Sequence, residues 1–113
     1  MKFPVLTAQE RAARLAPPTG KLRVVIDSDT YNEVDDQFAI AYALMSPERL
    51  NVEAVYAAPF SSAFLAKMMN ADAGIPMTAD LQEGLEQSYQ EILHLFSLLG
   101  RDPAGMVFRG SPT

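Results

Sequence analysis

The residues most able to do chemistry are five carboxylates within ten positions: Asp27, Asp29, Glu33, Asp35 and Asp36. Crowded carboxylates repel one another, and a divalent cation removes that conflict. Hard oxygen ligands at irregular spacing suit calcium or magnesium. Two ordinary roles compete with ligation, because an acidic pair complements the dipole at a helix start and an aspartate after a strand often forms a turn.

Local sequence signals place these carboxylates between a strand and a helix. Leu22 to Ile26 is a short, β-branched apolar run, which is typical of a parallel strand buried on both faces. A helix is predicted from Val34, and Val52 to Ala57 is the next strand. Because ligands of open α/β sheets bind outside the carboxyl ends of the strands, the acidic loop lies where a site is expected.

The buried face of this helix is predicted from apolar residues at helical spacing. The residues on that face are Val34, Phe38, Ala41, Tyr42 and Met45. Ile40 and Leu44 add apolar surface beside it, so the helix is expected to be well buried.

The rest of the chain completes an α/β pattern. Thr7 to Leu15 is predicted to be a helix with a capping box, and Leu81 to Leu99 is the clearest helix, with Asp80 and Gly100 as its caps. Met106 to Phe108 begins a third strand, and a short helix is predicted around Phe64 to Met69. We therefore expect a Rossmann-like three-layer sandwich with a mainly parallel sheet, in which residues 1–20 are an N-terminal extension and residues 21–113 form a βαβ core.

Composition narrows the function classes. The net charge of −5 argues against a nucleic-acid surface, and the absence of cysteine excludes disulfides, thiolate metal sites and a cysteine nucleophile. No apolar run reaches membrane-spanning length, so no membrane partner is expected. The N-terminus does not resemble a signal core, and a cytoplasmic protein is the simplest interpretation.

The acidic loop resembles the N-terminal region of the inosine-uridine-preferring nucleoside hydrolases. That family ends its first strand with Asp-x-Asp and opens the next helix with Asp-Asp; this chain has Asp27-Ser28-Asp29 and then Asp35-Asp36. The intervening Thr30-Tyr31-Asn32-Glu33-Val34 resembles a family branch with an Asn-Glu insertion. Residues 57–60, 86–93 and 108–111 also resemble that branch. The chain has a minority of a family member's length, so we expect a fragment, a truncated gene product or a degenerate relative that is incomplete for catalysis.

The resemblance implies a role for each matching residue. Asp29 and Asp36 would ligate calcium, Asp35 would be the catalytic base and contact the substrate, and Asp27 would support the loop by hydrogen bonding. Asn32 is a candidate ribose contact, with a turn role as the alternative. The implied reaction is hydrolysis of the N-glycosidic bond of a ribonucleoside to base and ribose, as in purine and pyrimidine salvage. A homo-oligomer is among the assemblies that we expect for the chain.

Two other interpretations stay open. Haloacid-dehalogenase-like phosphatases also begin with a strand and Asp-x-Asp, which Asp27-Ser28-Asp29 resembles, although that family gives no reason for Asp35-Asp36. The chain would otherwise be a non-catalytic relative that acts only by association with a partner or with itself, through an exposed sheet edge.

Overall fold

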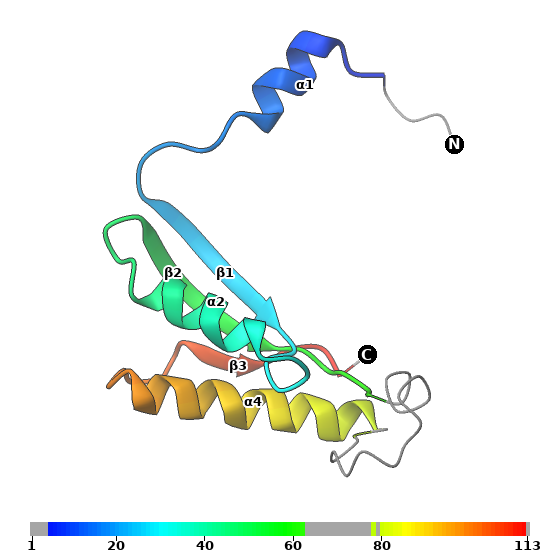
Figure 1. The fold of residues 1–113 in the computed structure, drawn as a ribbon, viewed down its shortest axis with the longest axis vertical. Helices are drawn as coiled ribbons and strands as arrows, with labels where there is room; N and C mark the ends of the chain where they lie inside the picture. Colours follow the sequence, from blue (N-terminus) through cyan, green and yellow to red (C-terminus); the bar gives the residue numbers. More distant parts are fainter. Residues whose placement is uncertain (1–4, 63–77, 79, 113) are drawn as a thin grey trace.

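Three parallel strands form the sheet of the computed structural model, which describes residues 5–62, 78 and 80–112 (Figure 1). The strands are β1 (Leu22–Ser28), β2 (Leu50–Ala57) and β3 (Val107–Arg109), in the order β1-β2-β3. In β1 and β2, Leu22 is aligned with Leu50 and Ser28 with Ala57. The α/β class and the parallel sheet expected from the sequence are confirmed.

Helices α2 (Asp35–Leu44) and α4 (Leu81–Leu98) connect the strands and share one core. The sheet grows in one direction, from β1 to β3, and crossovers of the same hand then place both helices on the same face. Of the three expected layers, the described residues supply the sheet and this helical layer. The buried core consists of Ile40, Leu44, Val55, Ala57, Leu85, Ile92, Leu95, Phe96 and Val107.

The predicted buried face of α2 is wrong. Val34, Phe38, Tyr42 and Met45 are all exposed, and Phe38 keeps 72 % of its surface accessible. The helix instead buries the opposite side, where Ile40 and Leu44 contact the sheet and α4. Apolar residues lie nearly all round this helix, so their spacing does not identify the side that packs.

Helix α4 begins and ends as its caps predict. The Asp80 carboxylate accepts a hydrogen bond from the Gln82 backbone N–H at 2.9 Å. At the other end Gly100 has a φ of 63°, and the N–H groups of Gly100 and Arg101 bond to the carbonyls of Ser97 and Phe96. This is the Schellman arrangement, which satisfies the last carbonyls of a helix.

Side chains of α4 and β2 hold β3 on both faces. The Arg109 guanidinium donates two hydrogen bonds to Glu86 of α4, at 2.8 and 2.9 Å, and lies 3.7 Å from the centre of the Tyr89 ring. These bonds from Arg109, with a further one from Gln90, lower the pKa of Glu86 to about 2. On the face away from the helices, the Phe108 ring stacks on Tyr56 of β2 with centroids 5.3 Å apart.

The N-terminal helix α1 (Ala8–Leu15) has no buried residue and is drawn apart from the sheet in Figure 1. The predicted capping box is confirmed. The Thr7 hydroxyl accepts from the Glu10 N–H at 3.2 Å, and the Glu10 carboxylate accepts from the Thr7 N–H at 2.8 Å. The helix expected around Phe64 to Met69 lies outside the described residues.

Candidate functional site

The acidic loop lies at the carboxyl end of β1, as predicted. Strand β1 ends at Ser28 and α2 begins at Asp35, so the loop occupies residues 29–34. The Asn32 backbone N–H donates to the Asp29 carbonyl at 2.7 Å, and the Asn32 side-chain amide donates to the Asp29 carboxylate at 3.0 Å. Asn32 thus has the turn role that the sequence left open, and it holds the Asp29 side chain in place.

Two buried hydroxyls connect this strand end to α2. Ser28 Oγ donates to Asp36 Oδ1 at 2.8 Å, and it lies 2.7 Å from Thr30 Oγ1. Because Ser28 has one hydroxyl proton and gives it to Asp36, Thr30 is the donor in the second bond. Sequence reasoning missed both hydroxyls. The signal that could have found them is their position: both are small hydroxyl residues next to Asp29, at the end of a buried strand.

Asp35 and Asp27 are both exposed and accept no hydrogen bond within the described ranges. Asp35 occupies the first position of α2, so its free carboxylate faces solvent beside the loop. Asp27 lies on the sheet face away from the helices. The hydrogen bonding by which Asp27 was expected to support the loop is not seen among the residues described.

The carboxyl ends of all three strands meet beside Asp27. The Gly110 N–H, directly after β3, donates to the Ala57 carbonyl at the end of β2 at 2.9 Å. A Cβ atom at position 110 would lie 2.7 Å from that carbonyl oxygen and 3.9 Å from Asp27 Oδ1. A glycine therefore lets the chain after β3 approach the acidic edge closely.

The donor chemistry of the loop suits calcium, but a complete site is not preformed. Asp29 and Asp36 each accept one hydrogen bond and keep other lone pairs free. No described group donates a hydrogen bond to the buried Oδ1 of Asn32, so this atom is a further oxygen donor beside Asp29. Across the described ranges, however, no group of three or more His, Cys, Asp or Glu side chains is arranged to hold a metal ion. Ligation by Asp29 and Asp36 stays a prediction that requires additional oxygens.

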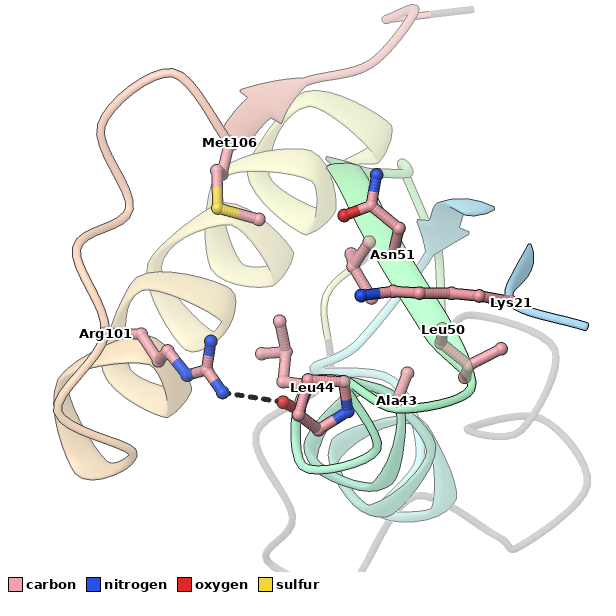
Figure 2. A pocket seen from close by; sticks show the side chains of 9 residues that line it. Lys21, Ala43, Leu44, Leu50, Asn51, Arg101 and Met106 are labelled. Carbon is pink, nitrogen blue, oxygen red and sulfur yellow. Dashed lines mark hydrogen bonds between the residues drawn. The ribbon is translucent and has the colours of Figure 1, made fainter. Parts of the chain in front are cut away.

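A pocket of about 100 Å³ lies at the opposite end of the sheet (Figure 2). In Figure 2, Lys21 and Arg101 enter it from opposite sides, and Arg101 donates to the Leu44 carbonyl at 2.8 Å. That bond satisfies a carbonyl at the end of α2, which is an ordinary structural role for arginine. None of the predicted site residues lines this pocket, and it is far smaller than a nucleoside site, so the acidic loop remains the better candidate.

No protein-family model, curated protein or solved structure matches the chain. Within the part of the chain that the structure describes, no helix is long and apolar enough to cross a membrane. The single histidine, His94, is exposed on α4.

Proposed function

We propose that this chain supplies the ribose-binding acidic edge of a nucleoside hydrolase-type site. The reaction is hydrolysis of the N-glycosidic bond of a ribonucleoside, which releases the base and ribose. The observation that carries the proposal is the position of Asp29, Asp35 and Asp36 in the loop after β1 and in the first turn of α2, at the edge of a parallel sheet where ligands bind.

The chain's own residues have distinct tasks in this proposal. Asp35 is the general base: its carboxylate is exposed and unpaired among the described residues, so it can accept a proton from an attacking water. Asp29 and Asp36 are held by Asn32 and Ser28, which restricts their rotamers before a ligand arrives. Preorganisation of this kind reduces the entropy lost on binding.

Asn32 is suited to contact the sugar. Its Nδ2 is used in the bond to Asp29, whereas its buried Oδ1 receives no hydrogen bond from the part of the chain that the structure describes. A buried acceptor without a partner costs roughly 1–3 kcal/mol, so a ribose hydroxyl that donates to it would recover part of that cost. The same atom is the natural third oxygen for a cation.

Calcium is the proposed cofactor, held by Asp29 and Asp36. When bound, it would supply positive charge that orients the sugar hydroxyls and a water molecule. Calcium takes about six to eight oxygen ligands, more than these two carboxylates provide. The remaining positions would be filled by water, by ribose or by other protein oxygens, and we expect weak binding without ribose.

Replacing Asp35 with asparagine tests the base role. The variant keeps the shape and the helix start but cannot accept the proton, so we expect ribose release from a nucleoside panel with calcium to fall about 100-fold from whatever rate the chain supports. Glu48→Gln is the matched control, since Glu48 is an exposed acid outside the loop. Equal turnover by Asp35→Asn and the unmodified chain would remove Asp35 from this role.

The same assay separates the other interpretations. If no nucleoside is cleaved under any calcium concentration and calcium does not bind, the chain is a non-catalytic relative. A phosphorylated Asp27 after incubation with a phosphate ester would instead indicate the phosphatase chemistry.

A further inference from the structure

Strand β1 has a free edge. Among the described strands it pairs with β2 alone, so the backbone groups on its other side have no strand partner. The centre of this edge is apolar, and Val25 keeps 60 % of its surface exposed on the face away from the helices. An edge of this kind is a template for another strand unless charges or bulges oppose the pairing.

The charges along this edge are arranged symmetrically about Val25. Lys21 and Arg23 precede it at spacings of four and two, and Asp27 and Asp29 follow it at spacings of two and four. Because side chains alternate between the faces of a strand, all of these positions within the strand share Val25's face. When a second copy of this segment runs antiparallel to the first, its acidic positions therefore lie opposite the basic positions of the first copy.

We propose that two copies of this chain associate through β1, with the two strands antiparallel and the two-fold axis at Val25. In this register Arg23 lies opposite Asp27 of the second copy, whereas Lys21 and Asp29 lie just outside the two paired strands. Val24 lies opposite Ile26 on the helical face. The two three-stranded sheets become one continuous sheet, in which the unpaired backbone N–H and C=O groups of one β1 edge bond to those of the other.

The side chains in the structure leave room for these contacts. Arg23 pairs with Glu53 through Nε and Nη2, so Nη1 is free for a second carboxylate. Asp27 is exposed and pairs with no described residue. Val24 and Ile26 are half-buried in one copy, and the second strand would cover the surface that they still expose.

Charge complementarity selects a second copy as the partner. An isologous interface needs a surface that matches itself, and β1 has this property because opposite charges lie at equal distances from Val25. Of the six ways to place two basic and two acidic residues at these four positions, two put like charges opposite one another, and that arrangement opposes pairing.

The test is sedimentation equilibrium of the full chain at concentrations up to about 300 µM. High concentrations are needed because an interface made by one short strand from each copy is small, and small protein–protein interfaces bind weakly. We expect a monomer–dimer equilibrium that weakens with salt. Asp27→Arg should raise the dimer dissociation constant about tenfold or more, since both symmetry-related pairs become repulsive. The exchange Arg23→Asp with Asp27→Arg should restore it to within about threefold.

Two further variants keep the test decisive if Arg23→Asp disturbs the fold. Val25→Lys alters an exposed side chain and places two ammonium groups at the axis, so it should abolish the dimer. Phe38→Lys, on the exposed face of α2, should leave the dimer unchanged. A wild-type chain that is monomeric throughout, a dimer insensitive to Val25→Lys, or a dimer lost with Phe38→Lys would overturn the proposal.

Discussion

Replacing Phe96 with alanine is expected to lower the free energy of unfolding by about 3–5 kcal/mol. Phe96 is completely buried and is the largest fully buried side chain among the described residues. It belongs to the core that joins α4 to the sheet, so its removal leaves a cavity that the neighbouring side chains fill only in part. Urea unfolding followed by circular dichroism measures the change.

Leu98→Ala is the matched control for this substitution. Leu98 lies in the same helix but keeps 68 % of its surface exposed, so its loss should change stability by no more than about 0.5 kcal/mol. If both variants unfold at the same urea concentration, Phe96 does not occupy the core described above.

Gly84→Ala is expected to cost about 3 kcal/mol, although alanine favours a helix over glycine by about 1 kcal/mol. A Cβ at Gly84 would lie 2.1 Å from the Phe60 carbonyl oxygen and 2.9 Å from the Phe60 nitrogen. Both are backbone atoms, so relief requires α4 to move away from the segment after β2. The glycine allows α4 to pack closely against this backbone.

The control for this prediction is Gln82→Ala, two residues earlier in α4. Gln82 is exposed, so the substitution should leave stability within about 0.5 kcal/mol. A Gly84→Ala variant that is more stable than the unmodified chain would show that helix propensity dominates, and that Phe60 and α4 do not pack this closely.

Local signals in the sequence predicted most of the fold. The capping box at Thr7, the cap at Asp80 and the αL glycine at Gly100 each depend on neighbouring residues, so they can be identified without tertiary structure. The parallel sheet followed from β-branched runs separated by helices. Strand β2 nevertheless begins two residues earlier than predicted, at Leu50, because pairing with β1 extends it.

The side of each helix that packs, and the residues that it packs against, were harder to predict from the sequence. Helix α2 has apolar residues on opposite sides, and tertiary contacts selected the Ile40 side over the Phe38 side. The close approach of Gly84 to the backbone of Phe60 likewise has no signal in the local sequence. Both depend on a neighbour far away in sequence, which periodicity does not report.

The acidic site was predictable in its location but not in its internal bonds. The position of the Asp residues followed from one strand and one helix. The hydroxyls of Ser28 and Thr30, and the approach of Gly110 to Asp27, depend on how three strand ends meet. Whether the carboxylates share a cation depends on distances of a few ångströms, which spacing along the chain does not determine.

Calorimetric titration with calcium, with and without ribose, tests the central claim most directly. We predict measurable calcium binding that ribose strengthens, and a loss of about tenfold or more in affinity for Asp29→Asn and for Asp36→Asn, with Glu48→Gln unchanged. Absence of binding heat in either titration, or equal affinity in the Asp36→Asn variant, would contradict a ribose-binding calcium site at this loop.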